Sequence, residues 1–326
     1  MRVAFFDTKP HDIASFNEPF KKVGIEVKYF DTHLNADTVQ LTNGFDAVCI
    51  FVNDIVDQAV VDKLCEFGVK VVVLRCAGFN NVDTKACAGR IPVFRVPAYS
   101  PYAVAEHAMA LLLTINRRTH KAYLRTREFN FSLKDMCGFD LRGKTVGIIG
   151  TGKIGRVFAD ICHGFGMNII GYDKFPTEHP HIRYVDLEEL FATSDIISLH
   201  CPLTFETYHM INAMAIKSMK PGVVIINTSR GGLVDTDALI DGLLARKIGA
   251  ACLDVYEEEA DVFFEDRSGH ILDDEKLVRL IAMPNVLVTS HQAFLTQEAL
   301  SNIAETTIDN LLKYERGEES PATQVC

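Results

Sequence analysis

The stretch that most constrains the fold runs from Lys144 to Asp173 and reads KTVGIIGTGKIGRVFADICHGFGMNIIGYD. An apolar run typical of a buried strand leads into a glycine-rich turn, a helical pattern follows, and a second apolar run ends at an acid. Glycines at this spacing, with an acid roughly 20 residues further on, are the fingerprint of a dinucleotide site. The glycines allow a tight turn, close approach of a pyrophosphate, and packing of the helix on the sheet. We therefore predict a dinucleotide site, rather than a ligand-free turn, at Gly150, Thr151, Gly152, Lys153, Ile154, Gly155 and Asp173.

Similar apolar runs recur along the chain with helical patterns between many of them, as expected for parallel sheets buried on both faces. The predicted strands are Val3–Phe6, Ala47–Phe51, Val71–Leu74, Thr145–Ile149, Asn168–Tyr172, Ile196–Leu199, Val223–Asn227, Ala250–Leu253 and Val286–Thr289. A predicted helix from Ser100 to Arg118 separates two groups of strands, and the chain is helical again from Thr296. We expect one domain from residues 1–99 plus 297–326 and a dinucleotide-binding domain from residues 100–296.

Composition excludes several classes of function. The chain has 326 residues, of which 48% are hydrophobic, and its 33 basic against 43 acidic residues give a net charge of −10. We therefore expect no nucleic-acid partner and no anionic-membrane partner. The N-terminus does not resemble a signal peptide, and the nine dispersed cysteines predict a reducing cytoplasm. Neither cysteine–histidine spacing nor the acidic runs fit a metal site, so we expect no metal.

Polar side chains follow four of the predicted strands. In open parallel sheets, ligands bind beyond the carboxyl ends of the strands. Each cluster alone could be an ordinary turn, and His291 alone could be a loop histidine bonded to a carbonyl. Together they predict one site near the nicotinamide end of a dinucleotide. Its candidate residues are His200, Cys201, Pro202, Thr228, Ser229, Arg230, Asp254, Glu259 and His291.

Arginine, glutamate and histidine in one site fit reduction of a 2-oxo acid. An arginine can hold a carboxylate through two parallel hydrogen bonds, and a histidine exchanges protons near neutral pH. A carboxylate beside the histidine fixes its tautomer. His107, on the long helix, fits helix packing better than catalysis.

At these residues the chain resembles the D-isomer-specific 2-hydroxyacid dehydrogenases, nearly from end to end. The matching stretches are RCAGFNNVD, RVPAYSPYAVAEHA, GKTVGIIGTGKIG, SLHCPLT, NTSRGGLVD, LDVYE and SHQAFLT. Within the family, LRCAGFNNVD, HCPLT, FFEDRS and SHQAFLT look most like the fermentative members that act on D-lactate.

The resemblance implies a flavodoxin-like catalytic domain and a Rossmann domain with a cleft between them. It implies NAD as cofactor and a homo-oligomer, either dimer or tetramer. It matches Arg230 to the substrate-binding arginine, His291 to the acid/base and Glu259 to the partner of that histidine. It places the backbone of Cys76, Ala77 and Gly78 at the substrate carboxylate, and Phe51, Tyr99 and Phe294 around its methyl end. Tyr102 departs from many relatives, which carry a small polar residue there.

The expected activity is reduction of pyruvate to D-lactate by NADH. Two alternatives stay open. The first keeps the chemistry but takes a larger 2-oxo acid or glyoxylate as substrate. The second is a non-enzymatic, dinucleotide-sensing corepressor, which would show negligible turnover.

Overall fold

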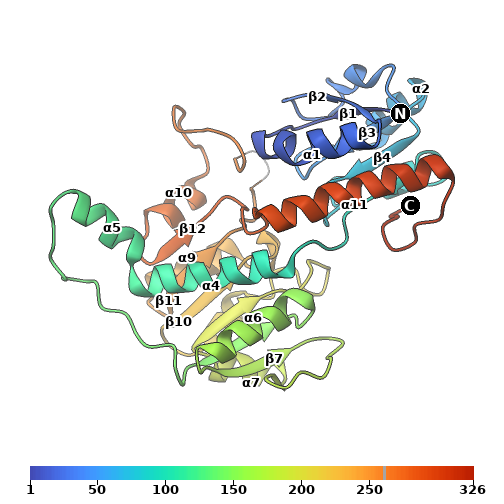
Figure 1. Ribbon diagram of the computed structural model, residues 1–326. Helices are drawn as coiled ribbons and strands as arrows, with labels where there is room; N and C mark the ends of the chain where they lie inside the picture. Colours follow the sequence, from blue (N-terminus) through green and yellow to red (C-terminus); the bar gives the residue numbers. More distant parts are fainter. Residues whose placement is uncertain (260–261) are drawn as a thin grey trace. The chain divides into compact units, whose positions relative to one another are not determined.

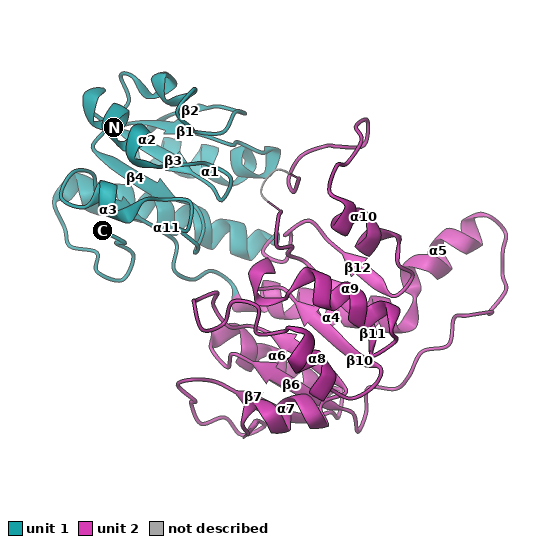
Figure 2. Ribbon diagram, turned by 180° about the vertical axis from the view of Figure 1, so that it is seen from behind, with its two compact units in different colours: residues 1–100, 295–326 teal, residues 101–294 magenta. Residues whose placement is uncertain are grey.

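The computed structural model describes residues 1–259 and 262–326, which form two compact units. Unit 1 comprises residues 1–100 and 295–326, and unit 2 comprises residues 101–294 (Figure 2). The expected boundaries, after residue 99 and before residue 297, lie one and two residues from these limits.

Unit 1 is built on a five-stranded parallel sheet of order β2-β1-β3-β4-β5 (Figure 1). Phe5 of β1 packs against Phe16 of α1, both rings and that of Phe20 on the same helix are fully buried, and helices α1 and α11 lie side by side. Its elements are β1 Arg2–Phe5, α1 Pro10–Lys22, β2 Glu26–Tyr29, η1 Val39–Thr42, β3 Ala47–Ile50, α2 Gln58–Glu66, β4 Val71–Leu74, α3 Thr84–Cys87, β5 Val93–Phe94 and α11 Gln297–Arg316.

Unit 2 is built on a seven-stranded parallel sheet of order β12-β11-β10-β9-β6-β7-β8. One apolar cluster packs helices α4 and α6 on one face, and a second packs α7 to α10 on the other. Its elements are α4 Pro101–Arg117, α5 Thr119–Arg127, β6 Thr145–Ile149, α6 Lys153–Gly164, β7 Asn168–Tyr172, β8 Arg183–Tyr184, α7 Leu187–Thr193, β9 Ile196–Leu199, α8 Ala213–Ser218, β10 Val223–Asn227, η2 Gly231–Leu233, α9 Thr236–Leu244, β11 Ile248–Leu253, α10 Glu275–Ala282 and β12 Val286–Val288.

The predicted fold class, two parallel α/β sheets with helices on their faces, is confirmed. All nine predicted strands are present, with small shifts at their ends. The sequence analysis missed β2, β5 and β8, which lie at the edges of the sheets. An edge strand is short or half-exposed, so it lacks the continuous apolar run by which the central strands are found. Among the described residues, no helix is both long and apolar enough to cross a membrane.

A buried ion pair anchors the carboxyl end of β4 in unit 1. Arg75 Nε donates to Asp12 Oδ1 at 3.1 Å, and their side chains are 2% and 6% exposed. The Arg75 guanidinium also donates to the carbonyl of Asp7 at 2.6 Å and lies over the rings of Phe5 and Phe51. Arg75 therefore joins α1, β1 and β4 where the three elements meet.

We expect Asp12→Ala to lower the free energy of unfolding by about 3–5 kcal/mol, because it leaves the buried arginine without its carboxylate. Urea denaturation followed by circular dichroism measures the loss. Glu66→Ala is the matched control, because it breaks the exposed pair with Lys63 and should cost much less. Equal losses of unfolding free energy in the two variants would show that the buried pair stabilises the fold no more than the exposed pair does.

Candidate active site

The glycine turn between β6 and α6 has the shape that a pyrophosphate needs. Gly150 has a φ of 93°, and a Cβ there would lie 2.5 Å from the Cys201 nitrogen. A Cβ on Gly155 would lie 2.1 Å from the Gly150 oxygen, so the helix packs directly on the turn. A Cβ on Gly152 would meet nothing within 4 Å, and no side chain caps the helix that begins after it. The open side of Gly152 and the uncapped N–H groups of α6 fit a phosphate group.

Asp173 follows β7, and protein donors hold its carboxylate in place. Oδ2 accepts from the Thr151 backbone N–H at 2.6 Å and lies 3.2 Å from the Thr151 hydroxyl. Oδ1 accepts from the Phe175 N–H at 2.8 Å. The Tyr184 hydroxyl lies 3.0 Å from that of Thr151 and supports this arrangement. A carboxylate fixed in this way, with lone pairs remaining, fits the hydroxyl groups of a dinucleotide ribose.

The segment after β9 carries His200, Cys201 and Pro202. The His200 ring packs against Phe158 at 5.1 Å between centroids, and its Nε2 lies 2.8 Å from the Ser198 hydroxyl. Burial lowers the pKa of His200 to about 4 and raises the pKa of Cys201 to about 11. Both side chains are therefore neutral at physiological pH, and neither serves as a charge or a thiolate nucleophile.

The segment after β10 carries Thr228, Ser229 and Arg230. The Ser229 hydroxyl donates to the Cys201 carbonyl at 2.6 Å, which ties this segment to the one after β9. Asn227 Nδ2 donates to the Arg230 carbonyl at 2.8 Å, and Arg230 Nη1 donates to the Ser229 carbonyl at 2.6 Å. One guanidinium nitrogen is thus held by the backbone, which orients the remaining donors.

Glu259 and His291 form the hydrogen bond that the sequence analysis expected. His291 Nδ1 lies 2.8 Å from Glu259 Oε1, with side chains 18% and 21% exposed. Glu259 Oε2 accepts from the Tyr256 N–H at 2.8 Å, so both carboxylate oxygens are used. The ring of Phe264 lies beside the histidine at 5.8 Å between centroids. This contact occupies Nδ1 and leaves Nε2 as the nitrogen for a reacting group.

Asp254 holds the backbone that presents His291. Its fully buried carboxylate accepts from the Thr289 hydroxyl at 2.5 Å and from the N–H groups of Gln292 and Ala293 at 2.9 and 2.8 Å. His107 Nε2 lies 3.3 Å from the same carboxylate. The sequence analysis placed Asp254 with the cofactor. The structure shows that its carboxylate anchors the His291 segment.

The loop after β4 in unit 1 presents backbone donors. The N–H groups of Ala77 and Gly78 have no acceptor among the described residues. Asn81 Nδ2 donates to the carbonyls of Phe51 and Asp54 at 2.7 and 2.8 Å, which joins this loop to the segment after β3. Free N–H groups in succession attract an anion. Asn81 carries no charge and is not among the predicted site residues. Only its hydrogen bonds in the structure show that it joins the two segments.

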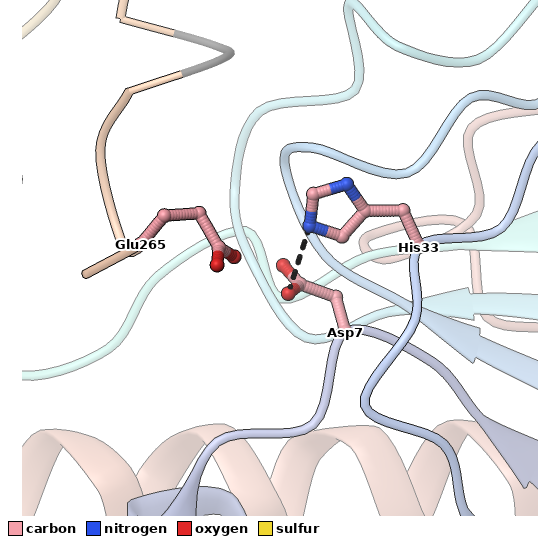
Figure 3. A group of neighbouring side chains, drawn as sticks. All are labelled: Asp7, His33 and Glu265. Carbon is pink, nitrogen blue, oxygen red and sulfur yellow. Dashed lines mark ion pairs between the residues drawn. The ribbon is translucent and has the colours of Figure 1, made fainter. Parts of the chain in front are cut away.

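A cluster of charges lies near the carboxyl end of β1 in unit 1 (Figure 3). His33 Nε2 is 3.2 Å from Asp7 Oδ1, and Lys9 Nζ is 2.9 Å from the same oxygen. Burial opposes the charge on Asp7, but His33 and Lys9 outweigh it and hold the pKa of that carboxyl below its usual value. The hydrogen bond to Asp7 raises the pKa of His33. Glu265, also drawn in Figure 3, belongs to unit 2.

The three aromatic residues predicted at the methyl end of the substrate lie in separate segments. Phe51 is buried after β3, under the Arg75 guanidinium at 4.7 Å from its ring. Tyr99 is partly buried in the segment before α4. Phe294 is buried at the last residue of unit 2.

The low pKa of His200 gives a stability prediction. Between its usual value of 6.5 and about 4, the unfolded chain binds a proton at this histidine and the folded chain does not. This contribution to stability is therefore present above pH 6.5 and is lost as the pH falls. We expect wild type to lose about 2 kcal/mol more than His200→Gln between pH 7.5 and pH 5, measured by urea denaturation. The control is His163→Gln, which replaces an exposed histidine on α6. Equal losses of unfolding free energy in wild type and His200→Gln would contradict the lowered pKa of His200.

Comparison with known proteins identifies the family of the chain. The family model described as D-isomer specific 2-hydroxyacid dehydrogenase, NAD binding domain, matches residues 109–293. A 2-hydroxyacid dehydrogenase homolog of Haemophilus influenzae is 52% identical over 321 residues, which are 97% of each chain. The D-lactate dehydrogenase of Escherichia coli is 49% identical over 98% of this chain and 99% of its own. A solved structure of the pyruvate reductase of Chlamydomonas reinhardtii has a TM-score of 0.93 at 43% identity, covering 98% of this chain and 97% of that one. This chain belongs to the D-isomer specific 2-hydroxyacid dehydrogenase family and carries its NAD-binding domain.

Proposed function

We propose that this protein is an NAD-dependent D-lactate dehydrogenase that mainly reduces pyruvate. The observation that carries the proposal is the His291–Glu259 hydrogen bond, with Arg230 in the segment after β10, a strand of the same sheet. The similarity to the D-lactate dehydrogenase of Escherichia coli supports the choice of substrate.

In the proposed mechanism, His291 is the proton donor and Arg230 holds the substrate. The reduced nicotinamide, when bound, supplies the hydride for C2 of the 2-oxo acid. The Nε2 proton of His291 passes to the carbonyl oxygen, while Glu259 keeps the ring oriented through Nδ1. Arg230 directs its planar fork at the carboxylate, and the free N–H groups of Ala77 and Gly78 bind the same group. The product is D-lactate, and a proton from solvent restores His291.

The same proposal assigns the cofactor contacts and the size of the substrate pocket. The turn from Gly150 to Gly155 takes the pyrophosphate, and Asp173 takes the ribose hydroxyl groups, which disfavours the extra phosphate of NADP. The segments after β9 and β10 line the rest of the cofactor site. Phe51, Tyr99 and Phe294 restrict the pocket to a methyl group, so branched 2-oxo acids are excluded by steric clash.

We also propose that the protein is a cytoplasmic homo-oligomer. All nine cysteines are free, which suits a reducing compartment. Helix α5 and the segment that follows it project from the sheet of unit 2 (Figure 1). Phe129, Phe131 and Leu133 on this segment are 84%, 72% and 84% exposed. Exposed apolar side chains so close together in the sequence suit an interface with a second copy.

The first experiment follows NADH absorbance with purified protein and a panel of 2-oxo acids. We expect pyruvate to be preferred to 2-oxoisocaproate, and NADH to NADPH by roughly 30-fold in kcat/KM, the equivalent of ~2 kcal/mol. His291→Ala should lower kcat by ~10²–10⁴-fold with NADH affinity nearly unchanged. Equal efficiency with 2-oxoisocaproate would transfer the assignment to a larger substrate. NADH binding without turnover of any 2-oxo acid would favour the corepressor alternative.

The second experiment measures molar mass by light scattering during gel filtration. We expect Phe129→Ser with Leu133→Ser to lower the mass relative to wild type at the same concentration, because the interface loses its apolar contacts. Leu244→Ser removes a 60% exposed leucine from α9 and should leave the mass unchanged. A wild-type protein that is monomeric at micromolar concentration would refute the proposed oligomer.

A further inference from the structure

The carboxylate loop, Cys76 to Gly78, is held through its carbonyl oxygens by the segment that follows β5. The Val96 N–H donates to the Cys76 carbonyl at 3.0 Å. Arg95 Nη1 donates to the Ala77 carbonyl at 2.9 Å. Two consecutive carbonyls of the loop are therefore fixed by two consecutive residues of one extended segment.

Fixing these carbonyls also fixes the direction of the free N–H groups. The Cys76 carbonyl shares a planar peptide with the Ala77 N–H, and the Ala77 carbonyl shares one with the Gly78 N–H. No peptide bond among the described residues is cis, so in each plane the carbonyl and the N–H point in opposite directions. Holding both oxygens toward β5 turns both N–H groups to the other side of the loop. Arg95 binds the carbonyl oxygen of the Ala77–Gly78 peptide and thereby sets the direction of the N–H group of Gly78 on the opposite side of that peptide.

Several contacts hold Arg95 itself in position. Its guanidinium lies over the ring of Phe79 at 5.1 Å from the centroid. Its backbone N–H donates to the Thr323 carbonyl at 2.9 Å, and its carbonyl accepts from Asn310 Nδ2 at 3.0 Å. The chain after α11 also pairs with β5 through an antiparallel bridge between Phe94 and Gln324. The C-terminal segment therefore stiffens the support from which Arg95 reaches the carboxylate loop.

We propose that Arg95 is a positioning residue for recognition of the substrate carboxylate, acting through the Ala77–Gly78 peptide. The inference rests on the proposed function, which assigns the carboxylate to these N–H groups. Without the arginine, the Ala77 carbonyl loses a charged donor and the peptide gains rotational freedom. The Gly78 donor then spends less time in the direction that a carboxylate requires. The proposed function assigns no cofactor contact to this loop.

The test compares wild type, Arg95→Met and Arg95→Lys in steady-state reduction of pyruvate by NADH. We expect Arg95→Met to raise KM for pyruvate about 10- to 100-fold, the equivalent of losing one charge-assisted hydrogen bond. The fall in kcat should be smaller, and KM for NADH should not change. Arg95→Lys keeps the charge and loses the planar fork, so its KM should lie between the other two. Arg90→Met is the matched control, because Arg90 pairs with Asp62 at the surface of the same unit.

Salt separates positioning from simple attraction of the substrate by a positive charge. An attraction through solvent is screened at 0.5 M KCl, whereas the direction of a peptide is not. The increase in KM for Arg95→Met should therefore persist at high salt. An increase seen only at low salt, or an unchanged KM, would overturn the inference. If Arg95→Met does not fold, the KM for pyruvate of Arg95→Lys becomes the test. A KM equal to that of wild type in Arg95→Lys would then contradict the proposal.

The outcome for wild type keeps the two proposals apart. If wild type prefers another 2-oxo acid, the proposed substrate is wrong and the Arg95 variants are measured with the preferred acid. If wild type reduces pyruvate and Arg95→Met matches it, only the positioning role fails. If wild type reduces no 2-oxo acid, both proposals fail.

Discussion

The buried carboxylate of Asp254 is the contact on which the geometry of the candidate site depends. Its hydrogen bonds to the Thr289 hydroxyl and to the N–H groups of Gln292 and Ala293 enclose His291 in a fixed turn. His291 has a φ of 51°, a left-handed conformation that is costly for a residue with a side chain. Such a conformation persists only where the surroundings over-determine it. Asp254 supplies this constraint on the backbone of the segment. The Glu259 carboxylate then orients the imidazole ring of His291.

Backbone donors made available by local structure recur in both units. At the glycine turn, the start of α6 leaves N–H groups without capping side chains. In the carboxylate loop, bonds to the carbonyls of Cys76 and Ala77 leave the adjoining N–H groups free. Both arrangements offer dipoles to an anion without a charged side chain, so their direction is as stable as the surrounding fold.

Much of the fold and part of the site could be predicted because the signals are local. The central strands are continuous apolar runs, so they are recognised from the local sequence pattern. The parallel fold class follows from the helices between them. The edge strand β2, EVKY, is half-exposed and carries no such signal. The His291–Glu259 contact was expected from the family motifs and is present. Arg95 and Asn81 were not found, because they act on backbone carbonyls that sequence patterns do not reveal. Asp254 was found as a polar residue at a strand end, but its anchoring of the His291 segment was not.

The sequence by itself determined nine of the strands in chain order, the glycine turn with its acid, and the family of the chain. These features depend on residues close together in the sequence, where spacing and apolar pattern decide the structure. Apart from the His291–Glu259 contact, only the tertiary structure decided which polar groups meet. His107, from α4, lies against Asp254 after β11, and Asn310, from α11, supports Arg95 after β5. Such pairs are separated by more than a hundred residues, and they form because helix packing on the sheet brings the segments together. A hydrogen bond depends on a few tenths of an ångström and on direction, and these follow from the packed backbone rather than from the identity of its residues.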